Sequence, residues 1–472
     1  MNFSPKAQIY KYFLTDVLTS YIGLALFMVI RFYILYDYHQ PWDFRSYIIS
    51  GKVMAESAVI PLGMLLIFWL SGFYNHPYER SRIQEFFTTL LSGIIIAFLI
   101  YFLLLTNDQV TEVSVNFELL LSLFLCVFIP VFTGRYCVTS IGFRHIRKHD
   151  WRFNTIIIGN SESARYQERE FRNTKTMYGY SVVAYIRLDG ENDAPDSEIP
   201  VHSLDEIDEI CKKYDVTQCI IVPEHYDEQR ILQILPRLFS LNLPIKIAAD
   251  TFSIITSGIR LTDIFADPFV DISAPNLSPS GQNIKRTLDV LISLSALVLC
   301  ALPMAAIALW IKIDSKGSVF YRQKRLGLHK RPFYIYKFRS MYADAEKDTP
   351  LLTTDSDNRV TKAGRIMRKY RIDELPQFWN VLRGDMSIVG PRPEREYFAQ
   401  KILEKAPYYT LIHQVRPGIT SWGMVKYGYA CNVEEMVKRA KFDIIYLNNM
   451  SLLIDTKIMI YTIKTVLTGR GQ

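Results

Sequence analysis

Two adjacent acids, Asp373 and Glu374, stand among basic residues in the segment RIMRKYRIDELPQFWN. An acid pair is also a common signal for the start of a helix, because carboxylates favour the first helical turn. Surrounding cations keep a carboxylate ionised at neutral pH, and an ionised carboxylate can act as a nucleophile or bind Mg²⁺. The pair is therefore a candidate catalytic centre.

Arginines and lysines near this pair could bind phosphate. The segment FYRQKRLGLHKRPFYIYKFRSM interleaves cations with aromatic residues, and a polyphosphate needs several cations at once. Arg325, Lys337 and Arg339 are the candidates there, although a flank that only binds lipid headgroups is the alternative. GDMSIVGPR and VRPGITSW place Arg392 and Arg416 in turns fixed by glycine and proline, which suits positioned guanidinium groups.

An apolar run at residues 288–311 precedes these segments and is long enough to span a bilayer. Both of its flanks are basic, so a straight span would place one basic flank outside, against the positive-inside rule. Pro303 removes a backbone hydrogen bond past the midpoint. We therefore predict a re-entrant membrane helix hairpin over residues 285–312. A straight span and a buried soluble helix are the alternatives.

Four further apolar stretches lie before residue 140, at residues 17–35, 53–73, 87–106 and 117–138. Each approaches the ~20 residues that cross a bilayer. We predict a four-helix transmembrane bundle over residues 1–150, rather than four buried core helices or a cleaved signal peptide. The distribution of lysine and arginine places the N-terminus and everything after the bundle on the cytoplasmic side.

Between residues 151 and 275, buried strand patterns alternate with amphipathic helices, which predicts a Rossmann-like α/β module with a parallel sheet. Its first strand–helix turn, GNSESA, has one glycine, Gly159, where a dinucleotide fingerprint has three, and Glu162 would repel a pyrophosphate. A structural or regulatory module is therefore expected, with nucleotide binding as the alternative. The linker NLSPSG leads to an α/β catalytic domain over residues 281–472.

The composition excludes other classes of protein. With 49% hydrophobic and 21% charged residues, the chain is too apolar to be disordered. The six cysteines contain no CxxC, so neither a disulfide framework nor a zinc site is expected. The net charge of +7 suits a membrane surface or phosphorylated ligands better than a nucleic acid.

Four segments after the apolar hairpin, in the order RQKRLG, YKFRSM, RIDELPQFWNVLRGDMSIVGPRP and VRPGIT, resemble the monotopic phosphoglycosyl transferases. These are also called polyprenyl-phosphate hexose-1-phosphate transferases. The resemblance runs from Lys285 to the C-terminus, and the spans and the α/β module resemble the long form of the family. It implies transfer of a sugar 1-phosphate from a UDP-hexose to polyprenyl (undecaprenyl) phosphate, with release of UMP. Such a reaction starts surface polysaccharide assembly at the cytoplasmic face of the bacterial inner membrane.

The resemblance also implies roles for single residues. Asp373 matches the nucleophile, which would carry a covalent phosphosugar, and Glu374 would bind Mg²⁺. Lys337 and Arg392 match positions that contact phosphate, and Asp443 matches another polar active-site position.

This sequence departs from the family pattern at two positions. Leu302 stands where many members have serine before the hairpin proline. Gly428 stands where the arginine of an Asn-Gly-Arg turn would fall, so the ligand contact made there must come from elsewhere.

Two other functions fit part of the chain. Membrane-bound nucleotide-sugar dehydratases have a similar first half and a Tyr-xxx-Lys pair, a spacing that Tyr397 and Lys401 share. However, they need a glycine-rich dinucleotide turn, and no GxGxxG or GxxGxxG follows residue 280. A non-catalytic assembly scaffold would not need Asp373 and Glu374 among arginines. The large membrane domain is consistent with a homodimer.

Overall fold

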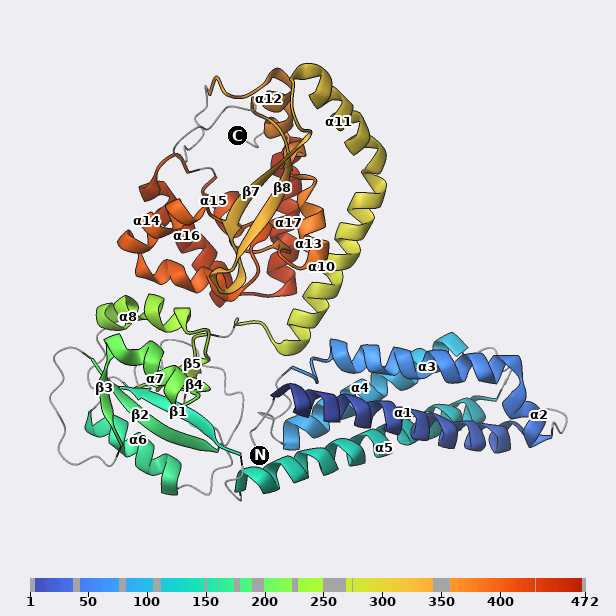
Figure 1. Cartoon of the computed structure of the whole chain (residues 1–472). Coiled ribbons are helices and arrows are strands. Elements are labelled where there is room, and N and C mark those ends of the chain that lie inside the picture. The colour runs from blue at the N-terminus through green and yellow to red at the C-terminus, as the bar shows by residue number, and fades with distance from the viewer. Residues whose placement is uncertain are drawn as a thin grey trace. The chain divides into compact units, whose positions relative to one another are not determined.

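The computed structural model describes most of the chain, and Figure 1 labels its helices and strands. Internal contacts divide the chain into two compact units. One is built on the N-terminal helices, and the other contains the central sheet and the C-terminal domain. The described residues are 5–36, 43–75, 82–104, 112–147, 151–159, 161–173, 179–188, 199–222, 228–248, 269–273, 275–342, 357–428 and 430–468.

The N-terminal unit is a bundle of long apolar helices. Among the described residues, four helices are long and apolar enough to cross a membrane, or five if a bent pair near residue 300 is one span. The four agree with the predicted spans, so this is a membrane protein. They are α1 (Pro5–Tyr36), α3 (Gly51–Leu70), α4 (Arg82–Leu104) and α5 (Val113–Arg147), and the short α2 (Phe44–Ile49) precedes α3.

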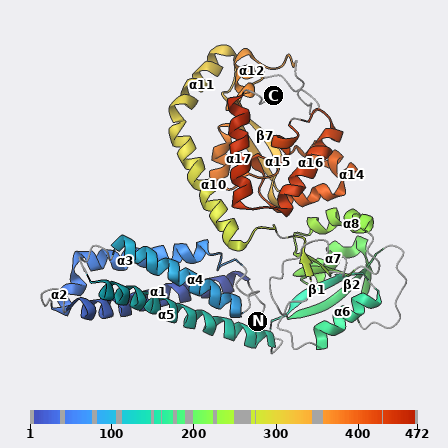
Figure 2. The ribbon, with the colours of Figure 1, turned by 180° about the vertical axis from the view of Figure 1, so that it is seen from behind.

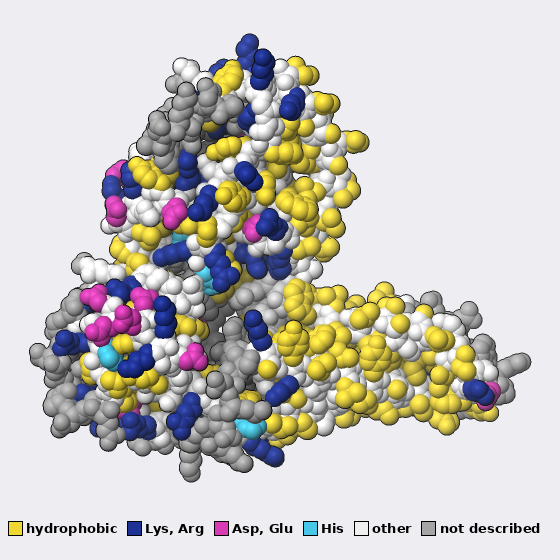
Figure 3. All heavy atoms as spheres, in the orientation of Figure 1, with side chains coloured by type: hydrophobic (Ala, Val, Ile, Leu, Met, Phe, Trp, Pro, Cys, Tyr) yellow, Lys and Arg dark blue, Asp and Glu magenta, His cyan; other side chains and the backbone are white. Residues whose placement is uncertain are grey.

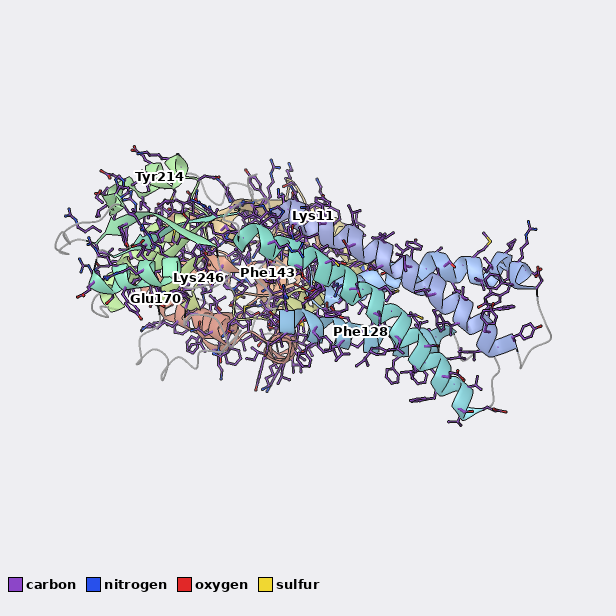
Figure 4. All side chains as sticks on the ribbon, turned by 90° about the horizontal axis from the view of Figure 1, so that it is seen from below. Lys11, Phe128, Phe143, Glu170, Tyr214 and Lys246 are labelled. Carbon is purple, nitrogen blue, oxygen red and sulfur yellow. The ribbon has the colours of Figure 1, made fainter. Side chains whose placement is uncertain are left out.

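The bundle has an apolar exterior and paired charges inside. Leu66 and Leu91 are 54% and 61% exposed, and Figure 3 shows the apolar side chains that cover the bundle. Helices α1 and α5 run side by side (Figure 4), and Arg135 of α5 binds Asp16 of α1 through Nε at 2.8 Å and Nη2 at 2.7 Å. Both of these side chains are fully buried. Lipid surroundings require this arrangement, because an unpaired charge in hydrocarbon is costly.

The central module is a mixed sheet with the strand order β3-β2-β1-β4-β5-β6. Strand β2 pairs parallel with β3, β1 with β4, and β4 with β5, as predicted, while β6 pairs antiparallel with β5. The predicted nucleotide turn includes Asn160, which lies outside the described residues. The elements are β1 (Phe153–Ile158), α6 (Glu162–Asn173), β2 (Tyr180–Arg187), β3 (Val201–Ser203), α7 (Ile207–Lys213), β4 (Gln218–Ile221), α8 (Glu228–Ser240), β5 (Ile245–Ala248) and β6 (Phe269–Asp271).

The C-terminal domain packs helices against two small sheets (Figure 2). An antiparallel hairpin joins β7 (Phe320–Leu326) to β8 (Pro332–Phe338), and β9 (Ser387–Val389) pairs parallel with β10 (Gly418–Thr420). The helices are α10 (Pro279–Leu299), α11 (Ala301–Asp314), α12 (Lys362–Lys369), α13 (Gln377–Arg383), α14 (Glu396–Lys405), α15 (Trp422–Lys426), α16 (Val433–Asn448) and α17 (Leu452–Leu467).

Helices α10 and α11 form the predicted apolar pair and meet at a bend of 60°. Pro303 has no N–H to donate to Leu299, its partner four residues back, and this explains why the bend lies at that point. Leu302 is 84% exposed beside the bend. The middle of the pair is therefore an exposed apolar surface.

Both helices of this pair contact the C-terminal domain. In α10, Asp289 accepts a 2.7 Å hydrogen bond from the hydroxyl of Ser387 in β9. In α11, Ile311 is buried with Phe338 and Met367 in a small apolar core. The pair therefore contacts the C-terminal domain both before and after its bend.

Candidate active site

Asp373 and Glu374 lie in a single 3₁₀ turn (Ile372–Glu374) between α12 and α13, and both are buried. Arg371 precedes the turn with a left-handed backbone (φ 53°), which ends the helical direction of α12. Pro376 then starts α13. The turn therefore separates α12 from α13 and buries the two acids in the domain.

Strand β8 brings Lys337 to the acid pair. Its Nζ donates to Glu374 Oε1 at 2.7 Å, and Arg371 Nη1 lies 3.8 Å from Glu374 Oε2. Asn380 of α13 holds the two elements together, because its amide accepts from Tyr336 N at 3.0 Å and donates to Tyr334 O at 2.7 Å. The side chain of Asn380 thus joins the β-hairpin to α13 beside the acid pair.

The two carboxyl groups have different electrostatic environments. Burial raises the pKa of Asp373 to about 6, and the nearby Lys337 opposes this rise. Burial also acts to raise the pKa of Glu374, but Lys337, Arg371 and Arg392 outweigh it and lower that pKa to about 2. Glu374 is therefore a permanent anion near neutral pH, while Asp373 is a more basic carboxylate, as suits a nucleophile.

Sequence reasoning missed two further donors, Arg368 and Gln377. Arg368 counted only as part of the basic neighbourhood, yet its charge acts on Asp373 and its Nε donates to Ser340 Oγ at 3.0 Å. Within the described residues, Arg368 Nη1 and Gln377 Nε2 are buried without a hydrogen-bond partner. A buried unpaired donor costs about 1–3 kcal/mol, so these groups favour a ligand rich in acceptor oxygens. In the sequence, the available sign that Gln377 belongs to the site was its position four residues after Asp373.

The carboxylate of Asp443 contacts the backbone of Arg392. Asp443 of α16 is buried and accepts hydrogen bonds from Gly423 N at 2.9 Å and Arg392 N at 3.4 Å. Burial raises the pKa of Asp443, and the hydrogen bond from Gly423 opposes that rise. A Cβ at Gly423 would lie 2.9 Å from Asp443 Oδ1, which explains the glycine. Asp443 thus positions the loop that carries Arg392. The positive charge of Arg392 helps to lower the pKa of Glu374.

The other three predicted phosphate ligands make contacts elsewhere in the domain. Arg325 Nη1 pairs with Glu394 at 3.3 Å, and burial lowers the pKa of Arg325 to about 10. Arg339 donates to the backbone oxygen of Ser315 at 2.6 Å, just after the end of α11. Arg416 Nε donates to Gly384 O at 2.9 Å. These contacts fix loops and helix ends, so a role in phosphate binding remains a prediction for all three.

The acid pair is chemically suited to Mg²⁺. The described residues contain no group of three or more histidine, cysteine, aspartate or glutamate side chains placed to hold a metal ion. Mg²⁺ is commonly held by only one or two carboxylates together with substrate phosphates, and Asp373 and Glu374 can supply these. Because Glu374 Oε1 already binds Lys337, a metal would depend on the substrate for most of its ligands.

Comparisons with known proteins identify the family of this chain. The family model "Bacterial sugar transferase" matches residues 280–469. A UDP-N-acetylgalactosamine-undecaprenyl-phosphate N-acetylgalactosaminephosphotransferase of Aeromonas hydrophila is 44% identical over 41% of this chain, and the match spans 46% of that relative, about half its length. Two UDP-glucose:undecaprenyl-phosphate glucose-1-phosphate transferases are also similar. The one of Caulobacter vibrioides is 42% identical over 39% of this chain and 70% of the relative. The one of Klebsiella pneumoniae is 28% identical over 86% of this chain and 87% of the relative. On this evidence the chain belongs to the bacterial sugar transferase family.

Proposed function

We propose that this protein transfers a sugar 1-phosphate from a UDP-hexose to polyprenyl phosphate and releases UMP. The observation that carries the proposal is the pairing of a basic carboxylate, Asp373, with cations and unpaired donors that suit a diphosphate. The names of the relatives, which include UDP-sugars and undecaprenyl phosphate, support the same substrates. The family resemblance noted in the sequence implies that the product would start the assembly of a surface polysaccharide.

The reaction would proceed in two displacements. The carboxylate of Asp373 attacks the β-phosphorus of the UDP-hexose, an O–P bond forms, and the bond to UMP breaks. An oxygen of polyprenyl phosphate then attacks the same phosphorus, and the Asp373 carboxylate leaves. Lys337 and Arg368 stabilise the negative charge on the phosphoryl oxygens, and Glu374 contributes to Mg²⁺ binding.

The bent pair α10–α11 would place this site at the membrane surface. Its two helices contact one domain on either side of the bend and its middle is apolar and exposed, so we propose that it enters and leaves the cytoplasmic leaflet of the bacterial inner membrane. Ile372 and Leu375, which flank the acid pair, pack against the apolar core around Ile311 of α11. A lipid phosphate at headgroup level could therefore reach Asp373.

The dehydratase alternative has less support. Lys401 Nζ donates to Tyr397 OH at 2.6 Å, but the pair lies on α14 at an exposed position. Within the described residues after 280, the sheets have two strands each, whereas a dinucleotide-binding domain requires a larger parallel sheet.

The decisive experiment measures nucleotide release from a panel of UDP-hexoses, with Mg²⁺, with and without undecaprenyl phosphate. We expect the wild type to release UMP and Asp373→Asn to release none. Glu404→Gln removes an exposed carboxylate from the same domain and should match the wild type. Release of UDP instead of UMP would show that the sugar moves without its phosphate, which contradicts the proposed mechanism.

A further inference from the structure

Two arginines from distant segments meet at the C-terminal end of α13. Arg286 of α10 donates to Val381 O at 2.7 Å and to Leu382 O at 3.1 Å. Arg416, which precedes β10, donates from Nε to Gly384 O at 2.9 Å. Cations at this end of a helix satisfy its last carbonyl groups and its dipole. This capping accounts for only part of their hydrogen-bonding capacity.

Arg416 keeps donors available after capping. Its two Nη groups have no hydrogen-bond partner among the described residues. Burial lowers the pKa of Arg416, the nearby charge of Arg286 lowers it further, and Asp289 acts in the opposite direction. Asp289 already accepts from Ser387 Oγ and Ile388 N. Two like charges held this close are more stable when an anion binds between them.

A third cation, Arg383, is the last residue of α13, and its side chain is 62% exposed. Asp385 lies 3.7 Å from Arg383 Nε but also accepts from Asn380 Nδ2 at 3.3 Å. Gly384 ends the helix in a left-handed conformation (φ 96°), and a Cβ there would lie 3.6 Å from Arg286 Nη2. Gly384 therefore places no side chain against the guanidinium of Arg286.

These arginines lie where the apolar surface of α10 begins. Leu288 and Leu291 follow Arg286 within two turns and are 43% and 54% exposed. If α10 enters the membrane, Arg286 is at headgroup level. A phosphate group of the bilayer would then face the three arginines.

This position is separate from the acid pair. Helix α13 starts three residues after Glu374 and ends at Arg383, and its seven residues extend roughly 10 Å at the usual helical rise. A phosphate at the far end of α13 is therefore a second ligand, distinct from the transferred sugar phosphate.

We propose that Arg286, Arg383 and Arg416 bind the phosphate group of an anionic phospholipid. The Nη groups of Arg416 and the exposed guanidinium of Arg383 donate to the phosphate oxygens, and Arg286 adds positive charge from its capping position. Binding of this lipid would anchor the base of α10 and α13 to the leaflet. The inference does not depend on the proposed transfer reaction.

The test titrates delipidated full-length protein in detergent with dioctanoyl-phosphatidylglycerol and counts bound lipid by native mass spectrometry. One cation near an anionic surface changes affinity about fivefold, so the double variant Arg383→Gln/Arg416→Gln should bind roughly 30-fold more weakly. The control Lys438→Gln/Lys441→Gln removes the same charge from exposed positions of α16 and should bind like the wild type.

Three outcomes would overturn the proposal. Equal binding by the wild type and the double variant would show that these arginines do not bind the lipid. If the double variant weakened the binding of dioctanoyl-phosphatidylcholine or of inorganic phosphate by the same factor, the arginines would have no preference for an anionic phospholipid. A loss confined to farnesyl phosphate would assign the arginines to the isoprenoid substrate instead. If the double variant does not fold, Arg383→Gln alone changes an exposed side chain and should show a fivefold loss.

Discussion

The raised pKa of Asp373 predicts that the first displacement of the proposed mechanism is sensitive to acid. Only the ionised carboxylate can attack phosphorus, so UMP formation should follow the ionised fraction of this group. With a pKa of about 6, that fraction is roughly nine-tenths at pH 7 and one-tenth at pH 5. Activity is therefore gained as pH rises through 6 and lost as pH falls through it.

Replacing Lys337 with methionine should move this acid limb to higher pH. Lys337 is the cation that most strongly opposes the effect of burial on the pKa of Asp373, and it also binds Glu374 at 2.7 Å. A cation within 4–6 Å lowers a carboxyl pKa by roughly 1–3 units, so its loss should raise the half-maximal pH from about 6 to about 7 or above. At pH 7, no more than about half of Asp373 would then be ionised.

The assay is single-turnover UMP release from pH 5 to pH 9 in the absence of acceptor lipid, because the first displacement is then observed alone. Lys337→Arg keeps the charge and should keep the acid limb near pH 6. It also serves if Lys337→Met fails to fold, since Glu374 would lose its closest partner. An acid limb in Lys337→Met that stays at pH 6 or moves lower would refute the assignment of Asp373 as the group that titrates.

Three other predictions concern packing and positioning. Gly364→Ala should destabilise the protein by roughly 1–3 kcal/mol, because its Cβ would lie 1.9 Å from the backbone oxygen of Ser340; thermal unfolding measures this. Arg135→Gln should cost about 3–5 kcal/mol, because Asp16 is left buried without its partner, and adding Asp16→Asn should recover part of that loss. Asp443→Asn should slow UMP release about tenfold, because the new amide group cannot accept from both backbone N–H groups.

For each of these variants, one result would contradict the prediction. Gly63→Ala, at a glycine with open space around it, is the control for Gly364→Ala, and equal melting temperatures for the two would contradict the close contact. A double variant at Asp16 and Arg135 no more stable than Arg135→Gln would show that the pair is not coupled. A wild-type rate in Asp443→Asn would remove its role in positioning Arg392.

Local patterns in the sequence were sufficient for several parts of the structure. The four spans and the apolar pair around Pro303 follow from hydropathy, which each segment carries by itself. The parallel strands of the central module follow from alternating periodicity, although nothing in the short segment Phe269–Asp271 indicated the antiparallel direction of β6. The acid pair was recognisable from its surroundings of basic residues.

Only the tertiary structure shows which of the candidate side chains lie near the acid pair. Arg325, Lys337 and Arg416 were all candidate phosphate ligands in the sequence, yet Lys337 contacts Glu374 while the other two contact Glu394 and Gly384. A cation takes its role from the acceptors within about 3 Å, and here those acceptors lie 32 to 69 residues away along the chain. Sequence by itself therefore determined which chemistry the chain can perform, and packing decided which side chains are placed to perform it.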